Sequence, residues 1–480
     1  MIWNRETIPK VWSKGLISKI PKKGGLSNCD NWRGITLLSI PSKVFWRVHL
    51  KRIDCTLDVK LRPEQAGFRK GRGCIDQIFA FRNIIEQCIE WNVPLYINFI
   101  GFKKAFDSVH RESLWKILRA YGIPHKVVTI IRTFYEHFEC GAIVENTQTE
   151  SFPVKSGVRQ GCILSPILFL VVIDWVMRKT TSGRPRGIQW TLFSCWEDLD
   201  FADELAVISA THSHLQEKSN RLSNFAKQTG LHINQKKTKV MFVNAPTASP
   251  ITINGEALKC IEDFTFLASL ISNNNGAHKD IQACLNIAKG AFSRLRNIWK
   301  SRQYSLKTKI RLYNSNVKAV LLYGSECWRI TKDDTRKVDV FHNGCLRKIC
   351  NIYWPNKILN VELHKKTDSM NMSLEIKNRR LLWLGHVLRM PENNGCLRNR
   401  KPKVAMRWTP SGKRKRGRKK TTWRRTVMKE LGEMGNTWGK AQAKARDRSV
   451  FRIFVAALCP RRDEEDDWVS VEELLDFSIC

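Results

Sequence analysis

The chain has 480 residues, of which 42 % are hydrophobic and 26 % charged, a composition that fits a globular protein with a hydrophobic core and about three domains. Lys and Arg total 82 against 44 Asp and Glu, and the formal net charge of +38 favours nucleic acid as a partner over an anionic membrane surface. Fifteen scattered cysteines exclude a disulfide framework, and no apolar run has the length of a transmembrane helix or signal peptide, so we expect an intracellular chain.

The first 88 residues are predicted to combine short strands with helices. Residues 16–25 form a strand and a basic turn, and residues 31–40 form a second strand. Residues 41–58 have the apolar spacing of a helix that starts with a Pro-Ser capping signal. Residues 62–91 begin as a glycine-rich basic loop and continue as a helix.

The middle of the chain is predicted to alternate strands and helices. Residues 95–102 are rich in β-formers and precede a helix expected over residues 103–121. Residues 151–180 are a turn that leads into a long buried helix. Residues 198–210 are two apolar strands joined by an acidic turn, and a helix is expected over residues 213–230.

The remainder is predicted to be mainly helical from residue 278 onward, with two charged segments near the end. Residues 397–425 hold 14 Lys or Arg and no acid, whereas residues 463–476 hold eight acids. We expect the first segment to contact nucleic acid phosphates and the second to be a solvated tail.

The acidic turn between the two apolar strands is a candidate for metal-dependent chemistry. Nucleotidyl transfer uses two divalent cations about 3.5–4 Å apart, and hard cations such as Mg²⁺ prefer carboxylate oxygens. One Asp at a strand end and two acids in a neighbouring hairpin turn would present such oxygens, and Asp203 and Glu204 lie at the tip of a predicted hairpin. Alone, an acidic pair of this kind is more typical of an ordinary turn.

Six motifs in one order change that interpretation: "NWRGITLL", "FIGFKKAFDSV", "SGVRQGCILSPILF", "FADELAVIS", "GLHINQKKTKVMF" and "DFTFLASLIS". Together they resemble the palm and fingers of reverse transcriptases of non-LTR (LINE-type) retrotransposons, closest to the RTE-like group. The resemblance covers nearly the whole chain and implies an α+β right-hand polymerase fold. The implied parts are fingers at 1–88, a palm with fingers elements at 89–262, a helical thumb at 263–395, and a basic then acidic C-terminal extension at 396–480.

The activity that the resemblance implies is RNA-directed DNA polymerisation, a nucleotidyl transfer. The implied partners are an RNA template, a DNA primer or target, and dNTPs, with Mg²⁺ or Mn²⁺ as cofactor and no membrane. Relatives usually carry an endonuclease ahead of the polymerase, and this chain, which starts within the fingers, is expected to lack it. The expected location is the nucleus or cytoplasm, and the oligomeric state is left open.

The resemblance also assigns the metal ligands, and here the sequence departs from the family pattern. Gly101 stands where the family carries its first metal-binding Asp, and a glycine cannot bind a metal through a side chain. Asp203 matches the stronger ligand of the acidic turn, and Glu204 replaces the second Asp with a side chain about 1.5 Å longer. Neither Asp107, which is not the ligand in the family, nor Asn98, which points to the opposite face of the strand, is expected to replace the lost carboxylate. Catalysis is therefore expected to be impaired.

The nucleotide-binding residues implied by the resemblance are Arg33, Phe106, Gln160, Gly161 and Lys237. Arg33 would contact triphosphate oxygens or form a surface salt bridge. Phe106 would lie under the sugar or in the core. Gln160 and Gly161 would form a turn that nucleotide and template approach closely. Lys237 would face the leaving pyrophosphate or simply be solvated. A stretch resembling a primer grip follows, with an alanine at position 268 where glycine is commoner.

The basic stretch 412–425, "GKRKRGRKKTTWRR", is a candidate for sequence-independent phosphate contacts and for a nuclear localisation signal. Trp408 and Trp423 would stack on bases or pack in the core. The spacing C-x₄-C-x₁₃-H-x₂₁-H fits no usual zinc finger, which leaves zinc as an alternative for Cys345, Cys350, His364 and His386. The cations of the candidate nucleic-acid contact are Lys413, Arg414, Lys415, Arg416, Arg418, Lys419 and Lys420.

A second function class stays open from sequence. A retroelement-derived protein that keeps the template-binding surface but has no catalysis would share the charge and the motifs. Both hypotheses predict binding to RNA and to primer–template, and only the polymerase predicts dNTP incorporation.

Overall fold

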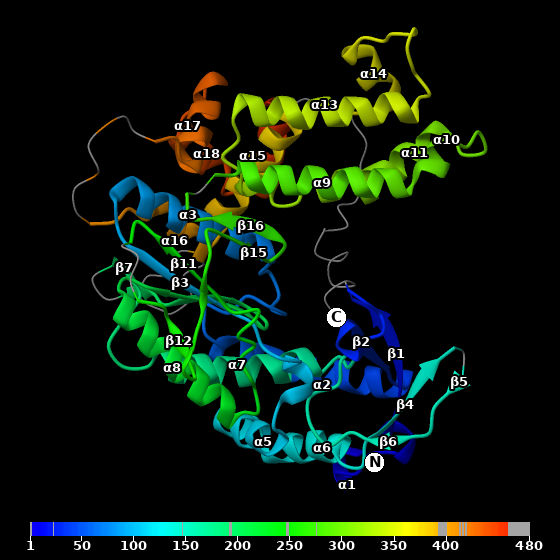
Figure 1. Ribbon diagram of the computed structural model, residues 1–480, viewed down its shortest axis with the longest axis vertical. Helices are drawn as coiled ribbons and strands as arrows, with labels where there is room; N and C mark the ends of the chain where they lie inside the picture. Colours follow the sequence, from blue (N-terminus) through cyan, green and yellow to red (C-terminus); the bar gives the residue numbers. More distant parts are fainter. Residues whose placement is uncertain are drawn as a thin grey trace.

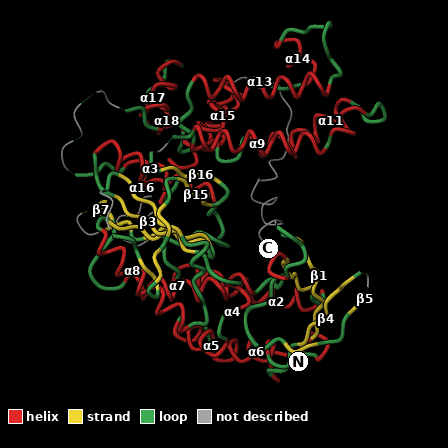
Figure 2. The backbone as a smooth tube through the Cα atoms, viewed as in Figure 1, coloured by secondary structure: helices red, strands yellow, loops and turns green. Residues whose placement is uncertain are grey.

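The computed structural model has the expected α+β architecture, with small sheets surrounded by helices (Figures 1 and 2). Figure 2 shows the strands in two main groups, one in the middle of the molecule and one at its lower right. The structure describes residues 2–22, 24–145, 147–191, 194–245, 249–274, 276–391, 401–411, 414, 417 and 420–458.

The central sheet has the order β14-β11-β3-β10-β9, and we call it the palm sheet. Its middle strand β3 is antiparallel to both neighbours, with Ile100 opposite Leu205 and Phe99 opposite Lys239. Every residue of β3 is buried, as expected for an apolar strand covered on both faces. The strands are β3 (Leu95–Ile100), β9 (Asp198–Phe201), β10 (Glu204–Ser209), β11 (Lys239–Val243) and β14 (Lys259–Cys260).

Alternate residues of β3 belong to two different hydrophobic cores. Tyr96 and Ile100 pack with helices α7 and α8 on one face, whereas Ile97 and Phe99 pack with α3 on the other. Asn98 lies on the α8 face, where its Nδ2 donates to Ser219 Oγ at 2.9 Å, so the predicted orientation of Asn98 is confirmed. The covering helices are α3 (Cys74–Trp91), α5 (Arg111–Ala120), α6 (His125–Tyr135), α7 (Ser165–Thr181) and α8 (His212–Gln228).

A second sheet, the fingers sheet, lies at the lower right of Figure 1. Its strand β1 runs antiparallel to β2 and parallel to β4, with Ile17 opposite Thr36 and Gly15 opposite Cys140. Its elements are β1 (Lys14–Pro21), β2 (Trp32–Leu37), β4 (Glu139–Val144), β5 (Thr147–Gln148) and β6 (Phe152–Pro153), and α2 (Ile40–Lys60) follows β2.

Helices with their own hydrophobic core form the upper part of Figure 1. Between them and the palm sheet lies the hairpin of β15 (Asp263–Phe266) and β16 (Ser269–Ser272). The last long helix of this group contributes Ile376 to the core of these upper helices. It contributes Leu381 to the core that α3 shares with the palm sheet, so it joins the two cores. The helices are α9 (His278–Arg294), α10 (Arg296–Lys300), α11 (Leu306–Tyr313), α12 (Ala319–Leu321), α13 (Lys332–Ile349), α14 (Asn360–Thr367) and α15 (Met372–Arg389).

The segment expected to be a C-terminal extension packs on the palm instead of projecting from it. Trp423, Val427 and Leu431 are buried in the same core as Phe79 and Phe81 of α3. The acidic stretch 463–476 lies outside the described residues. The helices of this segment are α16 (Lys401–Arg407), α17 (Trp423–Glu433), α18 (Trp438–Lys444) and α19 (Arg448–Leu458).

The described residues include cysteines and long helices whose pairing and hydropathy bear on two of the expectations. Each cysteine identified there is a free thiol. None of the described helices combines the length and apolar character that a bilayer crossing requires.

Candidate active site

The acidic turn is a two-residue connection between β9 and β10, because Phe201 pairs with Glu204. It places Ala202 in the left-handed region, at φ 53°. The buried side chain of Gln65 holds this residue: Oε1 accepts from the Ala202 N–H at 2.8 Å, and Nε2 donates to the Ala202 oxygen at 3.3 Å. Gly67 lies so close that a Cβ there would be 2.3 Å from the Ala202 nitrogen. The loop that sequence analysis described only as glycine-rich and basic thus fixes the acidic turn.

A buried ion cluster supports β9 beneath this turn. The guanidinium of Arg62 lies 2.5 Å from Asp200, 2.9 Å from Asp198 and 3.5 Å from Asp174, and all three carboxylates are fully buried. Burial and the charge of Asp198 raise the pKa of the Asp200 carboxyl well above its usual range. For Asp198, burial acts to raise the pKa, but the charge of Arg62 and the hydrogen bonds with Asp200 and Arg62 together outweigh burial, so the pKa of Asp198 is lowered. The cluster is an internal support, not a metal site.

Gly101 follows β3 directly, and the strand register places it level with Glu204. Its N–H donates to Thr238 Oγ1 at 3.2 Å, and its oxygen accepts from the Asn234 N–H at 2.7 Å. Gly101 is not among the residues with positive φ, so its backbone does not require glycine. A Cβ at this position would nevertheless lie 2.8 Å from the Cβ of Lys237. The space in front of residue 101 is therefore crowded by Lys237.

The carboxylates present do not fit a two-cation site. Burial raises the pKa of the Asp203 carboxyl, and the charges of Arg33 and Lys237 oppose this rise. Glu204 is turned toward the β15–β16 hairpin, where its Oε2 accepts from the Leu267 N–H at 3.0 Å. Within the part of the chain that the structure describes, no group of three or more His, Cys, Asp or Glu is placed to hold a metal ion. Asp203 is thus left as the principal carboxylate.

A group of cations from the fingers sheet and the palm lies next to Asp203. Arg33 and Lys237, both expected from the sequence, act on the pKa of Asp203, and Lys22 lies near these two cations and near Lys104. Burial first, and then the charges of three neighbours, lower the pKa of the Lys22 ammonium. In order of effect these neighbours are Arg33, Lys237 and Lys104. Lys22 follows β1 in "PKK" and Lys104 precedes α4 (Ala105–Ser108) in "FKKAF", but only the fold shows that the two lie together.

The remaining predicted nucleotide-binding residues lie between the palm and β2. Phe106 is half-buried and stacks on Phe169 with ring centroids 4.4 Å apart, which supports the core interpretation for one of its faces. Gln160 donates from Nε2 to Asp107 Oδ1 at 3.3 Å. Gly161 has φ +99°, and a Cβ there would be 2.5 Å from the Thr36 oxygen, so this turn needs glycine in order to dock on β2.

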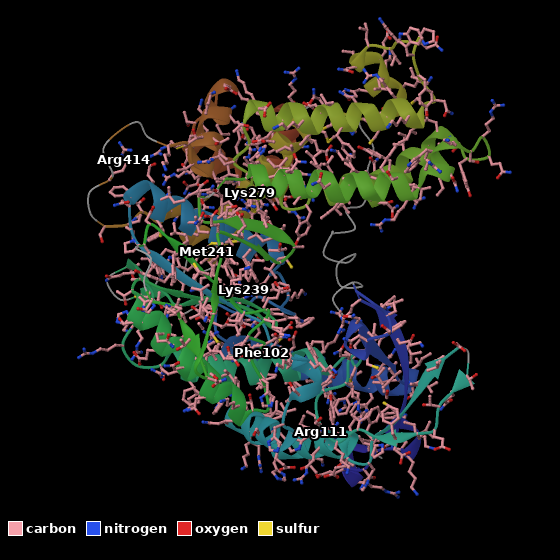
Figure 3. The ribbon with its side chains drawn as sticks, in the orientation of Figure 1. Phe102, Arg111, Lys239, Met241, Lys279 and Arg414 are labelled. Carbon is pink, nitrogen blue, oxygen red and sulfur yellow. The ribbon has the colours of Figure 1, made fainter. Side chains whose placement is uncertain are left out.

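Within the basic stretch 412–425, the structure describes Arg414, Gly417 and the residues from Lys420 onward. Five of its predicted contact residues lie outside the described residues: Lys413, Lys415, Arg416, Arg418 and Lys419. Arg414 lies 3.3 Å from the buried carboxylate of Glu90, and the Lys420 N–H donates to the same carboxylate at 3.1 Å. Figure 3 shows Arg414 at the outer edge of the molecule, away from Phe102, the neighbour of Gly101. Glu90 thus anchors part of this segment on α3.

The tryptophans and the zinc candidates have structural partners. Trp423 is 1 % exposed and packs edge-on against Phe79, and Trp408 is 6 % exposed, so both pack in the core and neither offers a face to bases. His364 is hydrogen-bonded to Asn343 at 2.7 Å, and His386 lies 3.9 Å from Asp76. Burial raises the pKa of the Cys345 thiol to about 12, which disfavours the thiolate that zinc binds. The zinc alternative gains no support from the described residues, in which no such ligand group forms.

The chain is similar to a known protein family and to several known proteins. Residues 20–280 match the family model described as reverse transcriptase (RNA-dependent DNA polymerase), and residues 291–323 match a domain of unknown function. The RNA-directed DNA polymerase from mobile element jockey of Drosophila melanogaster is 24 % identical over 76 % of this chain and 41 % of its own length. A Pol polyprotein from a type-1 retrotransposable element R2 of Popillia japonica is 28 % identical over 50 % of this chain and 34 % of its own length. The chain thus spans well under half the length of these relatives.

Among solved structures, apo telomerase from Candida tropicalis matches 92 % of this chain and 69 % of that chain, with 15 % identity and a TM-score of 0.39. The predicted resemblance to polymerases of non-LTR retrotransposons is confirmed by the family match and by these relatives.

Proposed function

Because the chain belongs to the reverse transcriptase (RNA-dependent DNA polymerase) family, we propose that it is the polymerase part of a non-LTR retrotransposon protein, that it binds template, primer and dNTP, and that Gly101 impairs its nucleotidyl transfer. One observation carries this proposal. The charges of Arg33 and Lys237, which suit a triphosphate, act on Asp203, yet the position beside the acidic turn that could supply another carboxylate is occupied by glycine and crowded by Lys237.

The proposed partners follow from chemistry. A triphosphate is held by charge-assisted hydrogen bonds, and Arg33, with its planar fork of donors, suits phosphate oxygens. An RNA template and a DNA primer are supported by the net charge of +38 and by the family match. Mg²⁺ or Mn²⁺ would have Asp203 as its principal carboxylate, and too few donors remain for a second cation. The boundaries of fingers, palm and thumb stay part of this proposal.

A non-catalytic RNA- and DNA-binding protein is the second candidate, and Gly101 favours it. The two candidates share every binding property. They differ only in dNTP incorporation, so binding tests the shared part of the proposal and primer extension separates the two.

Substitution of the clustered cations is expected to weaken dNTP binding while primer–template binding persists. Arg33→Ala and Lys237→Ala should each weaken dNTP affinity roughly 10–100-fold, because each removes a charge-assisted hydrogen bond. Titration of a fluorescent dNTP into the protein on an RNA–DNA primer–template measures this affinity. Lys116→Ala, which removes an exposed lysine of α5, is the matched control and should change nothing.

The same preparation tests nucleic acid binding. Affinity for a labelled primer–template should fall linearly in log–log form as salt rises, with little dependence on sequence. Unchanged dNTP affinity in both variants would remove the triphosphate assignment. Failure to bind primer–template at low salt would contradict the proposed function itself.

A further inference from the structure

The turn between β15 and β16 has a backbone conformation that its residues do not favour. Leu267 and Ala268 are its two central residues, with φ of 50° and 60°. Two positive φ values define a type I′ turn, which is usually made by Asn-Gly or Gly-Gly. Side chains with a Cβ are strained in this region, so contacts from the surroundings must hold the turn in place.

Two side chains hold the Leu267 residue from opposite sides. Its N–H donates to Glu204 Oε2 at 3.0 Å, and its oxygen accepts from the Tyr323 hydroxyl at 2.9 Å. Glu204 is the first residue of β10, directly after Asp203 of the acidic turn, and Tyr323 lies two residues after α12 in the chain. The three residues therefore join the acidic turn, the β15–β16 turn and the thumb part of the chain.

The length of Glu204 is what allows this contact. An aspartate at the same position would be shorter by about 1.5 Å, and the carboxylate would no longer reach the Leu267 N–H within hydrogen-bond distance. A glutamine has the length of glutamate, and its Oε1 accepts the same hydrogen bond without a charge. A metal ligand would show the opposite preference, because Asp keeps the charge that Gln lacks.

We infer that Glu204 is a positioning residue which, together with Tyr323, fixes the β15–β16 turn relative to Asp203, and that it does not serve as a metal ligand. The stretch that contains this turn resembles a primer grip, so the link would set where the primer terminus lies. That second step rests on the proposed function, whereas the link itself does not.

The link is tested by hydrogen–deuterium exchange of peptides that cover residues 264–272 in Glu204→Gln, Glu204→Asp and Tyr323→Phe. Exchange should match the unmodified chain in Glu204→Gln and should be about 5–10-fold faster at Leu267 in Glu204→Asp, because one hydrogen bond is lost. Tyr323→Phe should loosen the same peptides. Glu256→Asp is the matched control, because Glu256 also opens a strand after a two-residue turn, in β13 (Glu256–Ala257), and is exposed.

A second readout follows the primer terminus without requiring catalysis. A 2-aminopurine at the primer 3′ end should report an altered environment in Glu204→Asp and an unaltered one in Glu204→Gln, at equal overall affinity for the duplex. Equal exchange in all Glu204 variants, or greater disruption by Gln than by Asp, overturns the inference. If the protein binds no primer–template, the proposed function fails, and the exchange data alone decide whether the link exists.

Discussion

Gly101→Asp is expected to increase primer extension by this chain roughly 10²–10³-fold, the effect of restoring one preorganised charged group to a polymerase site. The added carboxylate would enter the space next to Lys237, and Lys237 in turn lies close enough to Asp203 to act on its pKa. The φ of residue 101 is not positive and so does not require glycine, but the new side chain needs Lys237 to shift, because its Cβ would lie 2.8 Å from the Cβ of Lys237. Single-turnover incorporation of one dNTP on an RNA template, in Mg²⁺ and in Mn²⁺, measures the gain.

Two further substitutions distinguish the effect of the carboxylate charge from the effect of side-chain size at residue 101. Gly101→Asn has the size of Asp without the charge, and Gly101→Ala adds only the Cβ that meets Lys237 at 2.8 Å. Both should leave incorporation at the level of the unmodified chain or below. An equal gain in Gly101→Asn and Gly101→Asp would show that charge is not what the site lacks.

Arg62→Met is expected to lower the free energy of unfolding by about 3–5 kcal/mol, because it leaves buried carboxylates without their counter-charge. Arg62 contacts Asp198 and Asp200 of β9 and Asp174 of α7, and these carboxylates have no access to water. Urea denaturation measures the loss. Arg132→Met is the control: Arg132 pairs with Glu136 at 3.0 Å on the surface, with side chains 51 % and 47 % exposed, and its loss should cost less than about 1 kcal/mol.

The deficit of Arg62→Met should depend on pH in a defined direction. Without Arg62, the folded-state pKa values of Asp198 and Asp200 lie above those of an unfolded chain, so the folded variant binds protons more tightly. Stability is then lost as pH rises and regained as pH falls toward about 4, the usual pKa of Asp. A deficit that is constant with pH, or no larger than that of Arg132→Met, would contradict the role given to this cluster.

The sequence predicts those parts of the site that depend on short motifs. The acidic turn is found because two apolar runs flank it, and Gly101 is noticed because its neighbours match a family motif. Arg33 and Lys237 are identified in the same way, and their charges do act on Asp203. The structure contains these features as predicted, because each one depends on a strand or turn formed by residues close together in the sequence.

Contacts between distant segments are what the sequence does not reveal. Gln65 holds Ala202 across 137 residues, and Glu204 reaches Leu267 across 63 residues. The basic segment was expected to contact phosphates because its own composition is cationic, and that composition does not show that part of it binds a carboxylate of the same chain. Glu90, which binds Arg414, lies on α3. The sequence of that helix does not indicate which distant cation the carboxylate of Glu90 contacts.

Whether Gly101 impairs nucleotidyl transfer is decided by the incorporation of a single dNTP by the unmodified chain and by Asp203→Asn, on the same RNA template and DNA primer. Both proteins should bind the primer–template, and their incorporation rates should agree within about tenfold, because the site is already short of carboxylates. If the unmodified chain incorporates dNTP about 10²-fold or more faster than Asp203→Asn, Gly101 does not impair the site, because the site then works with glycine at position 101.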